Sequence, residues 1–196
     1  MPKPYIPNDK WSRRAAADGY RARSVYKLME LDERFGLIKQ GMTVLDIGAA
    51  PGSWLQYAGQ RVGQEGLVIG VDLQDIKPIA DNVFTYKADI TDTAHMENIL
   101  RKHEVETADL VLSDIAPNTS GIKDVDQWRS VELSQAVMDL AMKLLKPGGV
   151  CVCKIFRGAD FDEFLRHLKA TWKRVGIKTV EASRDRSKEV YLVCTK

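Results

Sequence analysis

The sequence has few cysteines and few histidines. Its 196 residues include three of each. The odd number of thiols does not fit the paired framework of small disulfide-rich secreted domains. Because the cysteines stand in apolar runs, we expect them to be small buried hydrophobic side chains in a reducing compartment. The histidines are scattered without the spacing of a ligand set, so no metal site is expected. The cysteines are Cys151, Cys153 and Cys194.

The sequence also lacks long apolar segments. No run of about 18 apolar residues is present, which excludes a membrane-spanning helix, and the first seven residues, MPKPYIP, have no apolar core of a secretory signal. We therefore expect a cytoplasmic protein, or one of an organelle matrix if a transit peptide has been removed. With 44% hydrophobic and 29% charged residues, the composition is that of a soluble globular protein. We expect one domain over residues 1–196, in which residues 1–20 are a basic extension that orders on a partner.

The charge is balanced in total and uneven along the chain. The net charge is +2, but residues 1–27 carry +5, residues 28–165 carry −9 and residues 166–196 carry +6. Basic ends around an acidic middle are typical either of an RNA-contacting rim around a site for a cationic ligand or of solvated helices. Charge alone leaves both interpretations open.

Short β-branched runs alternate with segments of helical period. This order predicts an α/β fold with a mostly parallel sheet. We expect helices over 24–35, 128–145 and 161–172, and another after residue 54. The last two strand-like runs are close enough to pair as a hairpin, which gives a sheet of seven strands. The predicted strands are 43–47, 67–73, 83–86, 110–113, 150–156, 178–182 and 189–194.

A glycine-containing loop follows the first predicted strand. The segment Asp46–Trp54 reads DIGAAPGSW, and glycines at the carboxyl end of a parallel strand let the backbone approach a ligand. The spacing is not G-x-G-x-x-G, which disfavours a dinucleotide-binding dehydrogenase. A charged Asp46 beside this loop would repel a pyrophosphate and suit a cationic ligand.

Further acidic residues follow the next two strands. Asp72 ends the second predicted strand and Asp89 follows the third. Nucleotide-binding folds place a carboxylate near this position to accept hydrogen bonds from ribose hydroxyls, although Asp is also common at strand ends as a turn former. Three acids at successive strand ends predict a pocket for a cation that carries adenosine, and S-adenosyl-L-methionine fits that description.

The fifth predicted strand contains a lysine within an apolar run. Burial disfavours an unpaired lysine. Alternation should place Lys154 opposite Cys153 and beside Asp114, if the fourth and fifth strands are neighbours. Glu189 opens the last strand and offers a second carboxylate. A structural ion pair and a catalytic cluster both remain open.

Five motifs together resemble one family. They are YKL at 26–28, DIGAAPGSW at 46–54, SDIAPN at 113–118, KIF at 154–156 and SKEVY at 187–191. In this order and spacing, from about residue 19 to residue 193, they are similar to the FtsJ-type ribose 2′-O-methyltransferases, and in particular to the RlmE-like branch that modifies a uridine of ribosomal RNA. One departure is Ser53, where relatives often have glycine.

The resemblance implies a Rossmann-like class I methyltransferase fold, whose last strand is antiparallel. It implies a catalytic tetrad of Lys27, Asp114, Lys154 and Glu189. The cofactor contacts that it implies are Gly52, Trp54, Asp72, Asp89 and Asp114. The expected cofactor is S-adenosyl-L-methionine, which leaves as S-adenosyl-L-homocysteine, and no metal is expected.

The expected reaction is in-line transfer of a methyl group to a ribose 2′-hydroxyl, with Lys154 as the general base or as the group that orients the hydroxyl. We expect a monomer that binds the large ribosomal subunit or its RNA, with no appended RNA-binding domain. The basic ends would then contact RNA, with Trp11 and Tyr20 either stacking on bases or packing as anchors. Two alternatives remain: methylation of a ribose in the anticodon loop of transfer RNA, and a non-catalytic RNA-binding module. The basic residues before the tetrad's first lysine are Lys10, Arg13, Arg14, Arg21 and Arg23.

Overall fold

The computed structural model describes residues 10–117, 120–183 and 189–196. Residues 118, 187 and 188 of the family motifs therefore lie outside the described part. Within it, no helix is both long enough and apolar enough to cross a lipid bilayer. The helices are α1 (Lys10–Ala17), α2 (Val25–Phe35), α3 (Ser53–Val62), α4 (Thr93–Arg101), α5 (Lys123–Leu144) and α6 (Phe161–Thr171). The strands are β1 (Thr43–Ile47), β2 (Leu67–Asp72), β3 (Val83–Lys87), β4 (Ala108–Ser113), β5 (Leu145–Phe156), β6 (Arg174–Lys178) and β7 (Glu189–Thr195).

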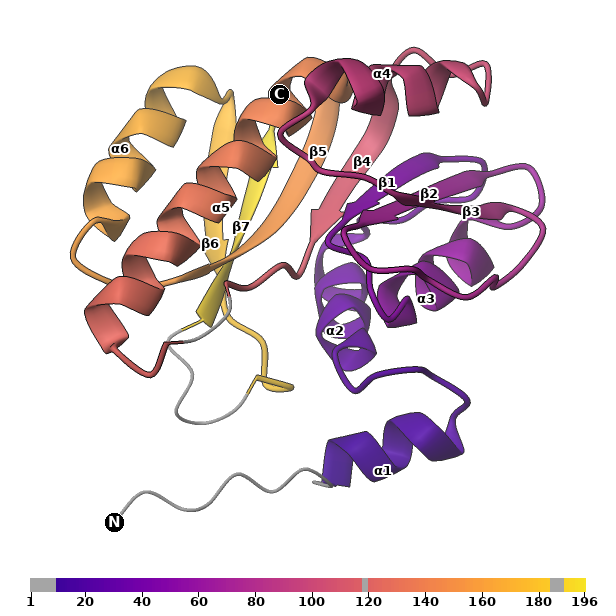
Figure 1. Cartoon of the computed structure of the whole chain (residues 1–196), viewed down its shortest axis with the longest axis horizontal. Coiled ribbons are helices and arrows are strands. Elements are labelled where there is room, and N and C mark those ends of the chain that lie inside the picture. The colour runs from indigo at the N-terminus through magenta and orange to yellow at the C-terminus, as the bar shows by residue number, and fades with distance from the viewer. Residues whose placement is uncertain (1–9, 118–119, 184–188) are drawn as a thin grey trace.

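The strands form one seven-stranded sheet in the order β3-β2-β1-β4-β5-β7-β6. The first five pair in parallel, whereas β7 is antiparallel to both of its neighbours. The predicted mostly parallel sheet with a final antiparallel strand is confirmed. In Figure 1 the carboxyl ends of β4 and β5 point downward, towards the side on which α1 lies. That edge is where an open α/β sheet binds its ligands.

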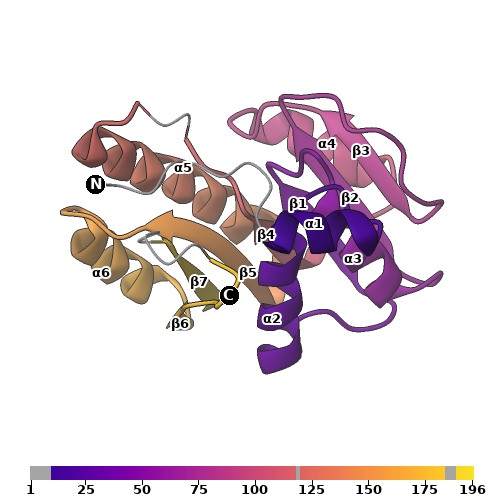
Figure 2. The same cartoon turned by 90° about the horizontal axis from the view of Figure 1, so that it is seen from below.

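Alternation along the strands divides the core between the two faces of the sheet. Leu45 and Ile47 pack on the face covered by α4, α5 and α6, whereas Val44 faces α2 and α3. On β5, Cys153 belongs to the first face and Val152 to the second. Figure 2 shows α4 and α5 on one side of the sheet and α2 and α3 on the other. Each inner strand is thus buried on both faces, as expected for a parallel sheet.

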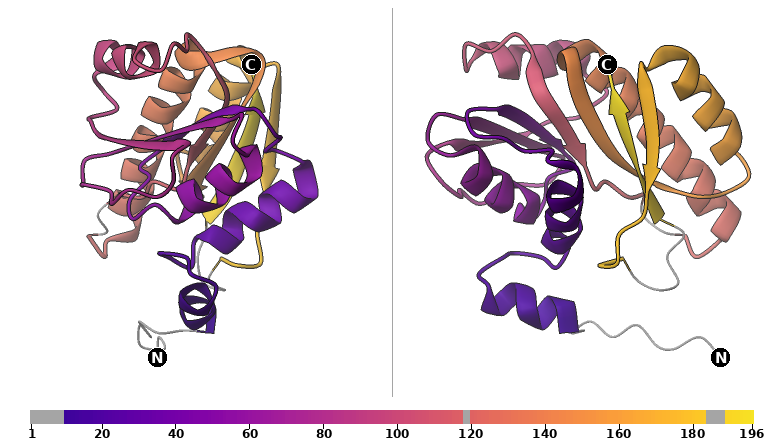
Figure 3. Two further views of the ribbon diagram at one scale, coloured as in Figure 1. Left: turned by 90° about the vertical axis from the view of Figure 1, so that its right-hand side faces the viewer. Right: turned by 180° about the vertical axis from the view of Figure 1, so that it is seen from behind.

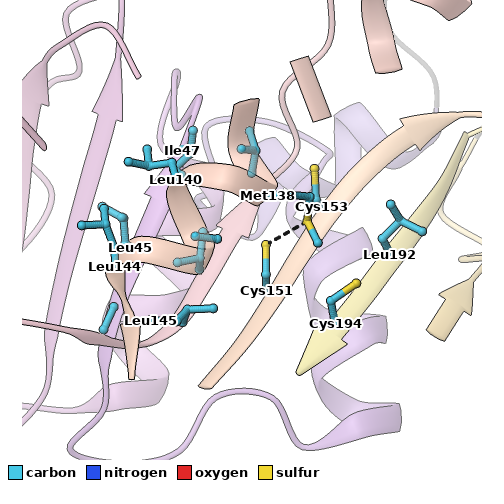
Figure 4. Close-up of a cluster of buried hydrophobic side chains, with 14 of the residues drawn as sticks. Leu45, Ile47, Met138, Leu140, Leu144, Leu145, Cys151, Cys153, Leu192 and Cys194 are labelled. Carbon is cyan, nitrogen blue, oxygen red and sulfur yellow. Dashed lines mark hydrogen bonds between the residues drawn. The ribbon is translucent and has the colours of Figure 1, made fainter. Parts of the chain in front are cut away.

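The three cysteines are free and buried, as the sequence predicts. Figure 4 shows them among leucine side chains between β5, β7 and α5, where the Cys151 Sγ lies 3.5 Å from the Sδ of Met138. Burial raises the pKa of the Cys153 and Cys194 thiols to about 12. Such thiols act as small hydrophobic side chains.

One predicted strand is misplaced. The strand expected over 178–182 is β6 at Arg174–Lys178, which pairs with β7. The following segment leaves the sheet because the Oε2 of Glu30 on α2 accepts hydrogen bonds from the backbone N–H of Glu181 (2.7 Å) and Ala182 (3.4 Å). Val180 of this segment is buried in the core cluster that includes Leu28 and Leu31 of α2.

Two further boundaries differ from the prediction. Helix α5 begins five residues early, since Asp126 accepts hydrogen bonds from the backbone N–H of Ser120 and Gly121 and so anchors the entry to its first turn. The Lys-Pro-Gly-Gly segment after α5 is part of β5, because Lys196 exchanges backbone hydrogen bonds with Gly148 and Gly149. Residues 10–17, expected within an extension that orders on a partner, form α1.

Core packing gives the first testable prediction. Leu45 is fully buried, whereas Leu73 is 67% exposed. We expect Leu45→Ala to lower the free energy of unfolding by about 2–5 kcal/mol, because it leaves a cavity between the sheet and the helices. The matched variant Leu73→Ala should change it by about 0.5 kcal/mol or less. Urea denaturation measures both, and equal losses would contradict this placement of the core.

Candidate active site

The loops after β1, β2, β3 and β4 and one face of α5 surround a cavity of about 820 Å³. A smaller pocket of about 40 Å³ adjoins it between the β1 loop, Trp54 and Asp114. The two spaces share Gly48, Ala50 and Asp114 in their walls. The β1 loop lies close to the β4 loop, since a Cβ on Gly48 would come within 2.8 Å of the Ile115 side chain.

Three of the sequence-predicted acids, Asp72, Asp89 and Asp114, line the larger cavity. The Oδ2 of Asp72 accepts a hydrogen bond from Ala50 N (3.0 Å), and its Oδ1 accepts one from Gln74 N (2.8 Å). The carboxylate thus joins the β1 and β2 loops. Asp89 accepts from the backbone N–H and the hydroxyl of Thr91, and these two bonds lower the pKa of Asp89 below its usual value. Asp89 is therefore an anion at neutral pH.

Trp54 and Gly52 have different relations to these spaces. Trp54 is buried in the wall of the smaller pocket, where its Nε1 donates to Ser24 O at 2.8 Å. Gly52 lines neither space, and the guanidinium of Arg21 lies beside it. Ser53, the one departure from the resembled motif, is buried with its Oγ 3.0 Å from the Oγ of Ser24.

Asp46 corrects one expectation from the sequence. It is 1% exposed on the α2 face of β1, so burial, followed by the charges of Asp114 and Asp72, raises the pKa of Asp46 well above its usual range. The carboxyl is not a surface anion beside the loop, because burial favours its protonated form. Among the described residues, its buried Oδ2 has no hydrogen-bond partner.

The four residues of the predicted tetrad meet at the carboxyl edge. Lys27 comes from α2 and Glu189 from the start of β7, and Lys27 Nζ lies 2.7 Å from Glu189 Oε1. Asp114 follows β4, and its Oδ1 lies 3.0 Å from Lys154 Nζ and 3.7 Å from Lys27 Nζ. Lys154 Nζ also donates to the backbone carbonyl of Asp114 at 2.5 Å. Lysines and carboxylates therefore alternate in one buried cluster.

Strand register explains this convergence. Lys154 pairs with Tyr191 across β5 and β7, and Tyr191 packs with the core on the α2 side of the sheet. Side chains two residues apart share a face, so Glu189 and Tyr191 point to the same side as Lys154. Helix α2 covers that face and brings Lys27 to it.

Two residues without a predicted role complete the cluster. The Tyr191 hydroxyl donates to Asp114 Oδ1 at 2.7 Å. Burial and then the Asp114 charge raise the pKa of Tyr191 well above its usual value, so this donor stays protonated. The Ser183 hydroxyl donates to Glu189. Tyr191 stands in a quoted motif, whereas Ser183 precedes Glu189 by six residues without a recognisable signal.

Glu189 is held in its charged form. Burial alone would raise the pKa of Glu189, but the charge and hydrogen bond of Lys27, together with the Ser183 hydrogen bond, lower it below its usual value. A charged carboxylate next to Lys27 fixes the position of that lysine. A buried cluster of opposite charges in a ligand-binding edge is a candidate functional site on physical grounds.

The basic residues before Lys27 do not all face solvent. Lys10, Arg13 and Arg14 are exposed on α1. By contrast, Arg21 donates to three backbone carbonyl oxygens and Arg23 Nη2 donates to Ala182 O at 2.8 Å.

Both aromatic residues of this basic segment make contacts within the chain. Trp11 packs on Tyr26 with ring centroids 5.2 Å apart. The Tyr20 hydroxyl donates to Gln60. Both contacts fit the interpretation of these aromatics as packing anchors.

Comparisons with known proteins agree with this geometry. The family model described as FtsJ-like methyltransferase matches residues 20–196. A protein of Chromohalobacter salexigens named Ribosomal RNA large subunit methyltransferase E is 43% identical over 186 residues, which are 95% of this chain and 88% of the relative. A protein of the same name from Azoarcus sp. is 45% identical over 95% of this chain and 90% of its own length.

A solved structure has a similar fold. The crystal structure titled as a ribosomal RNA methyltransferase of Plasmodium falciparum has a TM-score of 0.79 and 28% sequence identity, and the match covers 90% of this chain and 98% of that chain. The ordered motifs, the family match over residues 20–196 and the identity to these relatives lead to one assignment: the chain belongs to the FtsJ-like methyltransferase family.

Proposed function

We propose that the chain transfers a methyl group from S-adenosyl-L-methionine to the 2′-hydroxyl of a uridine ribose in large-subunit ribosomal RNA. The observation that carries the proposal is the meeting of Lys27, Asp114, Lys154 and Glu189 beside an acid-lined cavity. The relatives named Ribosomal RNA large subunit methyltransferase E support the substrate class. A ribosomal RNA substrate also favours the cytoplasm as the place of action.

The cavity residues fit this cofactor. Asp72 and Asp89 line the larger cavity and offer acceptor oxygens for ribose hydroxyls. Asp46 and Asp114 line the smaller pocket, where a positively charged group would favour the ionised form of Asp46 and give its unpartnered Oδ2 a partner. Trp54 and the backbone of the β1 loop complete that wall, and we assign Gly52 an indirect role behind it.

S-adenosyl-L-methionine supplies a methyl group on a positively charged sulfur. The chain must then hold a ribose hydroxyl in line with that methyl group, and orientation of this kind can contribute about 7–11 kcal/mol. We assign Lys154 Nζ to bind the hydroxyl, and either to accept its proton as the neutral amine or to orient it towards the methyl group. Asp114 positions Nζ through two oxygens, and Lys27 and Glu189 complete the ring of charges around the hydroxyl.

The exposed basic residues of α1 suit contacts with RNA phosphates. Figure 3 shows α1 beyond the carboxyl end of the sheet in both views, so its Lys10, Arg13 and Arg14 are on the side of the tetrad. Phosphate contacts position a nucleic acid without reading its sequence. We propose that α1 docks RNA while the tetrad acts on one ribose.

A labelling experiment tests the reaction. We expect the protein, given labelled S-adenosyl-L-methionine, to label large-subunit particles, with nuclease digestion and mass spectrometry placing the label on a uridine 2′-oxygen. Bulk transfer RNA is the parallel substrate. Label on transfer RNA alone would contradict the ribosomal substrate, and label on a base would contradict transfer to the ribose. No label on either RNA would contradict the methyltransferase activity and favour a non-catalytic RNA-binding module.

Variants at Lys154 test its role. We expect Lys154→Ala to lower the rate by about 100- to 10,000-fold, the usual contribution of proton transfer by a positioned side chain. Lys154→Arg should lose as much, because arginine keeps its proton and cannot accept another. Lys102→Arg, an exposed lysine at the end of α4, is the matched control. Near-normal activity in Lys154→Arg would show orientation without proton transfer.

The buried Asp46 carboxyl should make the stability of the fold depend on pH. Its raised pKa means that, above about pH 4, the folded state holds a proton that the unfolded state has lost. The contribution of Asp46 to the free energy of unfolding should therefore fall as pH rises above about 4, by up to about 1.4 kcal/mol per pH unit. Asp46→Asn should remove this slope, whereas the exposed control Asp81→Asn should keep it. Urea denaturation at several pH values measures it, and an unchanged slope in Asp46→Asn would contradict the assignment.

A further inference from the structure

Arg21 lies in the connection between α1 and α2 and holds two loops of the sheet edge together. Its Nη1 donates to the carbonyl oxygens of Pro51 (3.1 Å) and Lys77 (2.8 Å), and its Nη2 donates to that of Pro78 (2.7 Å). Pro51 belongs to the loop after β1, whereas Lys77 and Pro78 belong to the connection from β2 to β3. One guanidinium therefore bridges two separate backbone segments.

These two segments also form walls of the larger cavity. Ala50 precedes the Arg21 contact on the first segment, and Asp72 and Gln74 precede it on the second; all three line the cavity. On the cavity side, the hydrogen bond from Ala50 N to Asp72 Oδ2 joins the segments. Arg21 joins them a second time, farther from the strands. Backbone hydrogen bonds from Gly48 and Ala49 to Val71 O also join the β1 loop to the end of β2, whereas the bonds of Arg21 come from a side chain outside the sheet.

The site is shaped for an arginine. A planar guanidinium can donate in several directions at once, which a lysine ammonium on a flexible stem does not reproduce. A Cβ on Gly52 would lie 2.9 Å from Arg21 Nη1 and 3.0 Å from the Ile79 side chain, and the φ of Gly52 is +103°. The missing side chain of Gly52 makes room for the guanidinium. Gly52, although it belongs to the DIGAAPGSW motif, therefore contacts Arg21 and does not line the cavity.

The backbone of the same connection is fixed against α3. Arg21 N donates to Gln56 Oε1 at 2.9 Å, and Ser24 O accepts the Trp54 indole N–H at 2.8 Å. Figure 1 shows this connection looping below α3 before α2 begins. Lys27 follows three residues after Ser24. The segment that holds the cavity loops therefore also sets the start of the helix that carries the tetrad lysine.

We infer that Arg21 is a positioning residue for cofactor binding and that its guanidinium serves the cavity loops instead of RNA phosphates. The inference rests on the proposed function, because it takes S-adenosyl-L-methionine as the occupant of the cavity. A lysine at this position keeps the positive charge for RNA but loses the fork of donors. Arg21→Lys therefore separates the two roles.

The test compares Arg21→Lys with wild type and with Arg101→Lys, whose guanidinium bonds Asn98 and Glu97 on α4. We expect Arg21→Lys to weaken binding of S-adenosyl-L-methionine in equilibrium dialysis by roughly tenfold or more, and to raise its KM while kcat at saturating cofactor stays within about twofold. RNA affinity without cofactor should stay unchanged. Hydrogen exchange should speed up in residues 74–81 and not in β1. Arg101→Lys should match wild type in cofactor affinity.

Each contrary result has its own meaning. Weaker RNA binding with unchanged cofactor affinity would show a phosphate contact and overturn the inference. Faster exchange throughout the protein, with a lower melting temperature and unchanged cofactor affinity, would show a structural role only and overturn it as well. Failure of the wild-type chain to bind S-adenosyl-L-methionine would overturn the proposed function together with it, whereas wild-type binding with an unaffected Arg21→Lys variant would overturn the inference alone.

Discussion

The Oδ1 atom of Asp114 is the point at which the architecture of the site is held together. It accepts the Tyr191 hydroxyl and faces both buried lysines, so one oxygen connects β4, β5, β7 and α2. Removing charges from water is unfavourable unless partners are close and well oriented. The cluster meets this condition because each lysine lies against a carboxylate and each carboxylate accepts a further hydroxyl donor. Loss of Asp114 would remove the carboxylate that lies 3.0 Å from the buried Lys154 Nζ.

The sheet brings these groups together through register. Because β7 runs antiparallel to β5, the start of β7 lies opposite the end of β5, and Phe156 pairs with Glu189. A parallel last strand would begin at the other end of the sheet and place Glu189 far from Lys154. The reversal of one strand therefore gives the tetrad its second carboxylate. The cavity loops lie at that same edge, which brings the cavity and the four tetrad residues side by side.

Part of this arrangement follows from the sequence alone. Alternation along a single apolar run is enough to set Lys154 opposite Cys153. It places Asp114 beside Lys154 only if the fourth and fifth strands are neighbours, as β4 and β5 are, and the full tetrad is implied by the family resemblance. Residues that depend on contacts distant in sequence are not predictable in this way. Asp46 is buried because α2 and α3 cover its face of the sheet. Arg21 donates to carbonyl groups that are 30 to 57 residues away in the sequence. The difference between the predicted and observed bounds of β6 also depends on a distant contact, because Glu30 on α2 accepts a hydrogen bond from the backbone N–H of Glu181.

The buried cysteines have a practical consequence for following the protein during RNA docking. Thiols act as nucleophiles in the thiolate form, and burial keeps all three protonated and out of contact with reagents in solution. The native chain therefore needs no cysteine removal before labelling. A cysteine introduced at the exposed position 10 on α1 would be the reactive thiol of the folded protein. A fluorophore attached there would report the distance between α1 and a labelled RNA while the Lys27, Asp114, Lys154 and Glu189 cluster remains unmodified.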